Sequence, residues 1–357
     1  MSGNVFGNIL KLTSWGESHG EYIGGVLDGV PSNILLSEND IQPFLDKRKP
    51  GLNILSSQRK ENDKIELLSG IFNGKTTGMP IAFMIKNEDK KSSDYSKIKD
   101  LFRPGHADFT FFEKYGNRDY RGGGRSSARE TAIRVVAGAI ARKIIPHIKI
   151  QGALIQIGNL KINENNWNDE EINKNNFFCP DKQIIPEWEK LINKIKEEGD
   201  SIGAIIKVIA RNVDTGLGEP VYNKLSAELA KAIMSINAVK SFEIGDGIKV
   251  AEMKGSENCD QMFIKNSKPE FLSNHSGGIL GGISTGQDII IKFAVKPTSS
   301  ILIRQKTITT EFEETEVSTE GRHDCCIGIR AVAIGEAMMS LVLADYYLLN
   351  RIYKDFD

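Results

Sequence analysis

Clusters of glycine and polar residues recur along almost the whole chain, from Gly16 to Asp324. No linker rich in Pro, Gly or Ser separates them into two groups, and the chain contains no internal repeat. Clusters this far apart in sequence can form one site only if the segments between them interleave in space. We therefore predict a single domain over residues 1–357 with one composite site, although 357 residues would also suffice for two domains.

Composition narrows the class of protein. The 46 Lys and Arg residues nearly balance the 47 Asp and Glu residues, which argues against binding to nucleic acid or to a membrane surface. No charged N-terminal region precedes an apolar segment, and no run of about 18 apolar residues occurs. The cysteines lack the spacing of zinc ligands or of a disulfide framework; they are Cys179, Cys259, Cys325 and Cys326. We expect a cytoplasmic protein with free thiols and no bound metal.

The densest cluster is YRGGGRSSARET, at 120–131. Its S-x-x-E motif has the spacing of a capping box, which predicts a helix that begins at Ala128 and stops before Pro146. The start of a helix carries a partial positive charge, so Arg125 and Arg129 beside it favour a bound anion such as phosphate. The alternative is a solvated arginine cluster next to a flexible turn.

Two histidines stand beside glycines. His19 lies in GESHG, after a predicted strand, and His106 lies in RPGHAD, two residues before Asp108. Imidazole changes its charge near neutral pH and glycine lets a ligand approach closely, so both histidines are candidates for proton transfer. Each stretch also fits a simple turn, with Asp108 capping a following helix.

Further clusters carry charge or glycine. The cations at 47–49 follow a predicted helix and either bind an anion or form a solvated loop. KPTSS, at 296–300, joins one cation with three hydroxyls, which suits a phosphate tail but also fits a turn. The glycine-rich stretch 273–286 indicates close backbone approach to another strand or to a flat cofactor. Asp324 either belongs to the site or caps the last predicted helix.

Hydrophobic periodicity predicts the remaining elements. Strands are expected at 8–14, 23–30, 150–157, 204–210 and 288–295, with an antiparallel meander at 65–85. Helices are expected at 38–46, 128–144, 184–198, 225–235 and 327–352. Loops or irregular segments are expected in the polar stretches 87–100, 159–181, 256–269 and 308–321.

Taken together and in order, these motifs resemble the chorismate synthase family over nearly the whole chain; they are GESHG, RPGHAD, YRGGGRSSARET, GGILGGIS at 277–284, KPTSS and RHD-x-C at 322–326. The resemblance implies an α+β fold, a single-domain sandwich of antiparallel β-sheets around a helical core, assembled as a homotetramer. It implies an anti 1,4-elimination that converts 5-enolpyruvylshikimate 3-phosphate into chorismate and phosphate, the last common step of the shikimate pathway. Reduced FMN is the implied cofactor, used without net redox change.

The resemblance also implies roles for individual residues. His19 is similar to the residue that protonates the departing phosphate, His106 to the one that protonates the reduced flavin, and Asp324 to the carboxylate that helps flavin N5 take the hydrogen from C6. The implied substrate-binding residues are Ser18, Arg48, Arg125, Ser127, Arg129 and Arg134. The implied FMN-binding residues are Arg125, Ser126, Ser127, Asn237, Ala238, Gly281, Lys296, Pro297, Thr298, Ser299, Ser300 and Arg322.

The chain departs from the family pattern at a few positions. Lys47 and Lys49 flank Arg48 where arginines are usual, Cys325 stands where proline is usual, and Ile54 stands where an arginine is frequent. The missing cation at 54 removes one contact for the extra phosphate of NADPH, so we expect a separate reductant of the flavin. Two alternatives to an eliminase are a flavin-dependent oxidoreductase acting on a phosphorylated substrate and a non-enzymatic protein that binds phosphoanions.

Overall fold

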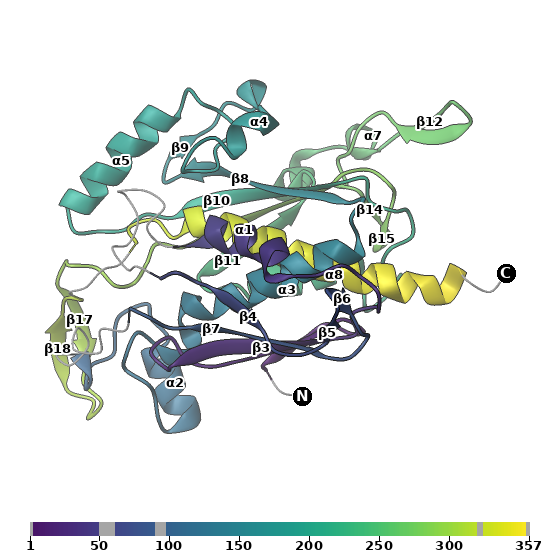
Figure 1. Ribbon diagram of the computed structural model, residues 1–357. Helices are drawn as coiled ribbons and strands as arrows, with labels where there is room; N and C mark the ends of the chain where they lie inside the picture. The colour runs from purple at the N-terminus through teal and green to yellow at the C-terminus, as the bar shows by residue number, and fades with distance from the viewer. Residues whose placement is uncertain (1–2, 50–60, 90–97, 320–323, 355–357) are drawn as a thin grey trace.

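The computed structural model of this chain describes residues 3–49, 61–89, 98–319 and 324–354. Two five-stranded antiparallel sheets lie on either side of a layer of helices (Figure 1). In strand order, the first sheet consists of β1 (Val5–Phe6), β2 (Lys11–Trp15), β3 (Tyr22–Asp28), β7 (Ile81–Lys86) and β4 (Ile65–Leu67). The second consists of β11 (Val239–Ile244), β16 (Ile289–Val295), β10 (Ala204–Arg211), β8 (Lys149–Ile157) and β9 (Leu160–Lys161). This mixture of helices and sheets confirms the predicted α+β class.

Three helices occupy the layer between the sheets, namely α1 (Glu38–Arg48), α3 (Thr131–Ile144) and α8 (Gly328–Lys354) (Figure 1). The helices α3 and α8 pack so closely that a Cβ atom added at Gly138 would lie 2.5 Å from the Cα atom of Ala337. A larger residue at Gly138 would therefore push the two helices apart. Because α3 follows the cluster at 120–131 directly, its packing fixes the position of that cluster.

The helix α8, with 27 residues, is the longest helix of the described chain. By length and composition it is the one described helix that could cross a membrane, but 83% of its most apolar window is buried inside the protein. Such burial is typical of a core helix. Near its C-terminal half, the Asp345 carboxylate accepts hydrogen bonds from the backbone N–H groups of Asn8, Ile9 and Leu10, each at 2.8 Å. These bonds tie the start of β2 to the core helix.

The remaining helices are α2 (Asp108–Tyr115), α4 (Asp169–Ile172), α5 (Ile185–Glu197), α6 (Leu225–Met234) and α7 (Gly255–Asn258), of which α6 packs against α8 and β11. The two-stranded pairs are β5 (Ile71–Phe72) with β6 (Lys75–Thr76), β12 (Met262–Lys265) with β13 (Lys268–Phe271), β14 (Ile279–Leu280) with β15 (Ile283–Ser284), and β17 (Gln305–Ile308) with β18 (Glu314–Val317).

The elements with clear hydrophobic periodicity are confirmed, including the predicted helices at 38–46, 184–198, 225–235 and 327–352. Short antiparallel strands do occur at 65–85, but the predicted meander is wrong, because β4 pairs with β7 while β5 and β6 pair with each other in a separate sheet. The loop predicted at 256–269 is wrong, because this stretch forms α7 and most of the β12–β13 hairpin. The loop predicted at 308–321 is also wrong in part, since 314–317 pairs with 305–308. Both hairpins are exposed, and their strands lack the alternation of apolar and polar residues that marks a half-buried strand.

Candidate active site

Segments that are far apart in sequence meet at one cleft of about 540 Å³, which we call the main cleft. His106, the 296–300 segment and Asp324 line it, and so do residues 126–129 just before the start of α3. The predicted site residues found there are His106, Ser126, Ser127, Arg129, Asn237, Ala238, Lys296, Pro297, Thr298, Ser299, Ser300 and Asp324. The interleaved chain therefore produces the single composite site that the spread of clusters predicts.

The glycine run in the 120–131 cluster packs against both histidines. Gly122 and Gly123 have left-handed backbone angles, with φ of 64° and 90°, which favour glycine. A Cβ atom at Gly122 would lie 2.4 Å from Cε1 of His19, and one at Gly123 would lie 2.8 Å from Cε1 of His106. Two consecutive glycines thus separate the two imidazoles, and neither has room for a side chain.

The start of the helix that follows differs from the prediction. A 3-10 turn occupies Ala128–Glu130, and the α-helix begins only at Thr131. The Ser127 hydroxyl accepts a hydrogen bond from the Arg129 N–H at 3.4 Å, as a cap does. The Glu130 carboxylate instead forms an ion pair with Arg134 at 2.8 Å. The predicted reciprocal capping box is therefore wrong, because Glu130 has a cationic partner one turn later.

His19 is buried and lies against Ser18. The Oγ atom of Ser18 is 3.0 Å from Nδ1 of His19 and donates a hydrogen bond to the carbonyl oxygen of Arg121 at 3.3 Å. A hydroxyl that donates to a carbonyl accepts from the imidazole, so this pair favours a proton on Nδ1 of His19. The bond links His19 and Ser18 to the segment that contains the glycine run.

His106 lies in a cluster of charges beside the main cleft. Its Nδ1 atom is 3.0 Å from Oδ1 of Asp108 and 3.1 Å from Nη2 of Arg103. Asp108 also accepts from Nε of Arg103 at 2.7 Å and pairs with Arg118 at 3.2 Å. Burial lowers the pKa of His106 below its usual 6.5; the bond to Asp108 opposes this shift, and the charges of Arg103 and Lys296 add to it. The imidazole is therefore neutral at pH 7.

The helix-cap alternative for Asp108 is wrong. The residue before α2 in the cap position is Ala107, and no side chain caps the helix. Burial alone would raise the pKa of the Asp108 carboxyl, but the hydrogen bonds from Arg103 and His106 lower it far below the ordinary range. RPGHAD thus contains a buried arginine and a buried carboxylate, besides the histidine, that sequence reasoning did not select.

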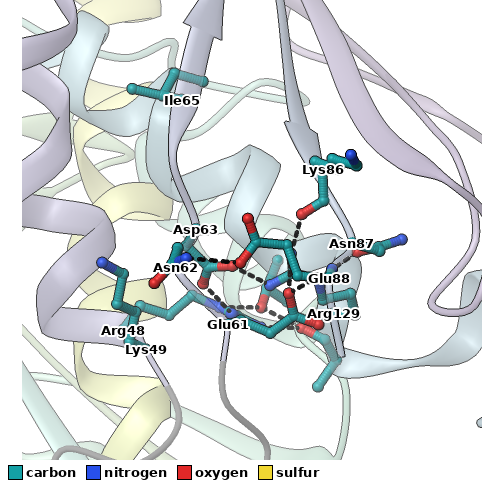
Figure 2. A network of polar contacts seen from close by, with 12 residues as sticks. Arg48, Lys49, Glu61, Asn62, Asp63, Ile65, Lys86, Asn87, Glu88 and Arg129 are labelled. Atoms are coloured by element: carbon teal, nitrogen blue, oxygen red, sulfur yellow. Dashed lines mark hydrogen bonds and ion pairs between the residues drawn. The ribbon is translucent and has the colours of Figure 1, made fainter. Parts of the chain in front are cut away.

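Two of the predicted substrate-binding arginines belong to a buried polar network (Figure 2). Arg48 is fully buried and donates to the Ala128 carbonyl at 2.7 Å and to Thr131 Oγ1 at 3.1 Å. It also pairs with Asp63 at 3.5 Å. Arg129 forms an ion pair with the other oxygen of Asp63 and contacts Glu61 at 3.6 Å. Two arginines and two carboxylates therefore balance one another behind the main cleft.

The network also connects to the first sheet. Arg129 donates to the side-chain oxygen of Asn87 at 2.8 Å, and the amide of Asn87 donates to the carbonyls of Glu17 and Gly20. Burial raises the pKa of Asp63, but the charges of Arg129 and Arg48 lower it more, so the carboxyl is ionised at neutral pH. The network therefore joins the loop that carries His19 to Arg129 at the cleft.

The other two predicted arginines line a neighbouring cleft of about 920 Å³, which meets the main cleft at Ser126 and Asn237. Arg125 donates to Ser14 Oγ at 2.8 Å and to the Gly16 carbonyl at 3.2 Å. These acceptors are neutral, so Arg125 keeps its charge for an anion. Arg134 donates to Ser235 Oγ at 2.7 Å, in addition to its ion pair with Glu130. Of the four predicted arginines, Arg129 thus lines the main cleft and two line the neighbouring cleft, whereas Arg48 is buried and lines neither.

The far wall of the main cleft offers polar atoms. The side-chain oxygen of Asn237 is buried and has no hydrogen-bond partner within the described part of the chain, while its amide donates to the Ser126 carbonyl at 2.8 Å. Ala238 has a left-handed φ of 67°, which is uncommon for a residue with a side chain and occurs often at functional sites. Lys296 donates to the Gly105 carbonyl, and Asp324 forms an ion pair with Arg330 in the first turn of α8.

Among the described residues, two predicted FMN-binding residues do not line the main cleft, namely Arg125, which lines the neighbouring cleft, and Gly281. Gly281 lies in the turn between β14 and β15 and lines neither of the two clefts. Arg322 lies outside the described residues, as does Ile54. The structure therefore adds Arg103, Asp108, Glu61 and Asp63 to the site, and leaves Gly281 apart from it within one chain.

Comparison with known proteins identifies relatives over the full length. The family profile described as chorismate synthase matches residues 10–348. The chorismate synthase of Pelagibacter ubique is 56% identical over 98% of this chain and 99% of its own length. That of Ruegeria pomeroyi is 53% identical, covering 98% of this chain and 97% of its own. A solved structure titled "Crystal Structure of Chorismate Synthase" superposes with a TM-score of 0.76 at 30% identity, covering 97% of this chain and 93% of that one.

Proposed function

The chain belongs to the chorismate synthase family, and from this premise we propose that it converts 5-enolpyruvylshikimate 3-phosphate into chorismate and phosphate with reduced FMN in the main cleft. Membership of this family identifies the protein as a lyase of the shikimate pathway. The observation that carries the proposal is the convergence of His106, the 296–300 segment and Asp324 on one cleft. We also propose that the two sheets and the enclosed helices form the family's single-domain sandwich.

The residues of the main cleft fit a flavin mononucleotide. The side-chain oxygen of Asn237, which has no partner among the described residues, needs a hydrogen-bond donor, and an N–H of the flavin ring can supply one. The neighbouring Ala238 has only a small side chain, which suits close approach of a flat ring to this wall. Lys296 and the hydroxyls of Thr298, Ser299 and Ser300 suit the phosphate tail. When bound, reduced FMN supplies the ability to lend an electron and recover it, which allows elimination without net redox change. Ser126, Ser127, Pro297 and Arg125 complete the proposed contacts, with Gly281 and Arg322 as further candidates by family match.

Elimination requires groups that handle protons on separate sides of the substrate ring. We propose that His19 protonates the departing phosphate and that His106 exchanges a proton with the cofactor. Asp324, held by Arg330 at the cleft wall, assists removal of the hydrogen at C6. A positioned general acid or base typically contributes about 10²–10⁴-fold to a rate. Both histidines contact the glycine run, so a single backbone segment holds their relative position.

The substrate carries a phosphate and two carboxylates, which need cations. We propose that Arg125 and Arg129 bind it directly, with Ser18, Ser127, Arg134 and Arg48 supporting them. Asp63 and Glu61 form ion pairs with Arg48 and Arg129. The guanidinium groups of these arginines are therefore oriented, and their charges are partly neutralised, before the substrate binds. Arg125 contacts only neutral acceptors and offers the strongest unsatisfied charge for an anion.

We further propose that the enzyme is a cytoplasmic homotetramer that depends on a flavin reduced elsewhere. The proposal of a separate reductant rests on Ile54, which stands at a position where the family often has a cation.

The assay of the proposed function is anaerobic formation of chorismate from 5-enolpyruvylshikimate 3-phosphate with photoreduced FMN. The proposed function requires that a catalytic amount of reduced FMN supports many turnovers. Consumption of one reductant per product would instead identify an oxidoreductase and overturn the proposal.

A further inference from the structure

The buried carboxylate of Asp108 lies 3.0 Å from Nδ1 of His106, while Nε2, the other ring nitrogen, lies beside the glycine run. We infer that Asp108 is a positioning residue that holds the proton of neutral His106 on Nδ1, so that Nε2 is the nitrogen that accepts and returns a proton at the cleft. This inference rests on the proposed function, because it concerns the proton transfer assigned there to His106. Asp108 lies at the wall of the neighbouring cleft, and we assign it a role that acts through His106.

The donors around Asp108 decide how its two oxygens are used. Oδ2 accepts from Nε of Arg103 at 2.7 Å and from the backbone N–H of Arg103 at 3.1 Å. Oδ1 accepts from Nη2 of Arg103 at 2.9 Å, and it lies 3.2 Å from Nη1 of Arg118 and 3.0 Å from Nδ1 of His106. The carboxylate can only accept, so a bare Nδ1 at this distance would set two lone pairs against each other.

One contact favours the opposite tautomer. Nη2 of Arg103 lies 3.1 Å from Nδ1 of His106 and can only donate, so it favours a bare Nδ1 and a proton on Nε2. Nη2 also has the charged oxygen of Asp108 within reach at the shorter distance of 2.9 Å. A hydrogen bond from Nδ1 to a carboxylate is charge-assisted on the acceptor side. The carboxylate therefore determines the tautomer, and Arg103 holds the carboxylate in place.

The position of Nε2 agrees with this division of roles. A Cβ atom added at Gly123 would lie 3.1 Å from Nε2 of His106 and 3.0 Å from the Ser126 hydroxyl. Ser126 and the preceding Gly122 line the main cleft. The charged groups that face His106 come from three segments, with Asp108 from α2, Arg103 from the preceding loop and Lys296 from the segment after β16. Since Arg103 and Lys296 disfavour the imidazolium, a single proton remains on the ring, and its location decides what Nε2 can do.

The test reads the ring nitrogens directly, independently of activity. Full-length protein labelled with ¹⁵N-histidine contains only five histidines, and magic-angle-spinning NMR separates protonated from bare ring nitrogens in a protein of any size. The His106 signals are assigned by their loss in His106→Gln. We expect a protonated Nδ1 and a bare Nε2 near neutral pH, with and without FMN. A wild-type protein that carries the proton on Nε2 overturns the inference, and this measurement needs no variant to fold.

The matched variants are Asp108→Asn and Asp246→Asn. Asp246 lies 2.6 Å from Nδ1 of His275, outside both clefts, so the second variant makes the same chemical change at an unrelated pair. In Asp108→Asn the backbone N–H and Nε of Arg103 retain the amide oxygen at the Oδ2 position. The amide NH₂ then takes the Oδ1 position and faces Nδ1, so the proton moves to Nε2. Turnover should fall roughly 10²–10⁴-fold, while Asp246→Asn keeps wild-type turnover.

The outcomes separate the two proposals. A wild type that forms no chorismate defeats the proposed function, but the NMR still reports whether Asp108 fixes the tautomer. A folded Asp108→Asn protein whose His106 tautomer is unchanged overturns the inference, even if its turnover falls, because a purely structural carboxylate would behave in that way. A changed tautomer with unchanged turnover overturns it as well.

Discussion

Replacing Gly122 by alanine should remove activity without unfolding the protein. The added Cβ would lie 2.4 Å from Cε1 of His19, 2.7 Å from its Nδ1 and 3.1 Å from Oγ of Ser18. Carbon atoms in contact are separated by at least about 3.5 Å, so the ring must move by roughly 1.1 Å, the difference between 3.5 and 2.4. His19 is 8% exposed and has little room to yield. A displacement of about 1 Å can reduce catalysis by roughly 10²-fold.

The variant has a second effect that must be separated from the first. Gly122 has a φ of 64°, and any residue with a Cβ is strained in that region by about 1–2 kcal/mol. Gly74 provides the control, because it has a φ of 72° and a Cβ added there meets nothing within 4 Å. Gly74→Ala should therefore lose the same stability and keep its turnover.

The assay compares anaerobic chorismate formation and the midpoint of urea unfolding for the wild type, Gly122→Ala and Gly74→Ala. We expect similar losses of stability in both variants and a fall in turnover of about 10²-fold in Gly122→Ala alone. If Gly122→Ala turned over like the wild type, the position of the His19 ring would not matter to the reaction. If Gly74→Ala lost activity equally, backbone strain rather than the contact with His19 would be the cause.

Four further predictions concern other parts of the molecule. Asp63→Ala should lower the free energy of unfolding in urea by about 3–5 kcal/mol, because it leaves two buried arginines without this partner. The control Asp46→Ala, at the surface pair with Lys49, should lower it by only about 0–1 kcal/mol. Equal losses in the two variants would contradict the role of the network. Burial raises the pKa of Asp63, but Arg129 and Arg48 bring it below its unfolded value of 3.8. The contribution of Asp63 to the free energy of unfolding is therefore complete above about pH 5 and is lost as the pH falls through the folded-state pKa. Measured against pH in the acid range, the free energy of unfolding should change less steeply in Asp63→Asn than in the wild type. Iodoacetamide should label the exposed Cys259 first, and peptide mass spectrometry measures the order of labelling. The other thiols should react more slowly, because burial raises the pKa of Cys179 and Cys326 to about 12 and also raises the pKa of Cys325. Equally fast labelling of Cys325 would contradict this reasoning. NADPH alone should fail to bleach enzyme-bound FMN in an anaerobic spectrum, since one lost charge-assisted contact is worth about 1.5–3 kcal/mol; rapid bleaching would show that Ile54 is irrelevant.

The sequence predicts those features that depend on local pattern. The amphipathic helices at 185–197 and 225–234 follow from spacing and stop signals alone, and the residues of the KPTSS motif are found at the cleft. The β12–β13 hairpin was missed although it carries a local signal. Its turn residues Asn266 and Ser267 have φ of 51° and 60°, as a two-residue hairpin turn requires. The signal was overlooked because both strands are largely exposed, so hydrophobic alternation is absent.

Long-range pairing is the part that no local pattern contains. Nothing in the stretch around Asp63 indicates that its two oxygens bind Arg48 and Arg129, which are 15 and 66 residues away. The placement of Arg125 and Arg129 at different clefts has a local cause, since Arg125 lies in the 3-10 turn Gly124–Ser126 and Arg129 in the next one, Ala128–Glu130. A helix start was predicted there, whereas two consecutive 3-10 turns rotate the side chains apart. Side-chain direction therefore changes the site even when every residue is correctly identified.

The glycine run has a structural meaning beyond anion binding. In the sequence it indicates a loop that lets phosphate approach the backbone, and that interpretation treats its glycines as equivalent. In the structure Gly122 makes room for His19 and Gly123 makes room for His106. The backbone of two consecutive glycines thus packs against both imidazoles, and a side chain at either position would have to displace a ring. If the two histidines are the proposed proton-transfer groups, this segment positions both of them, because it has no Cβ atom that could enter the space either ring occupies.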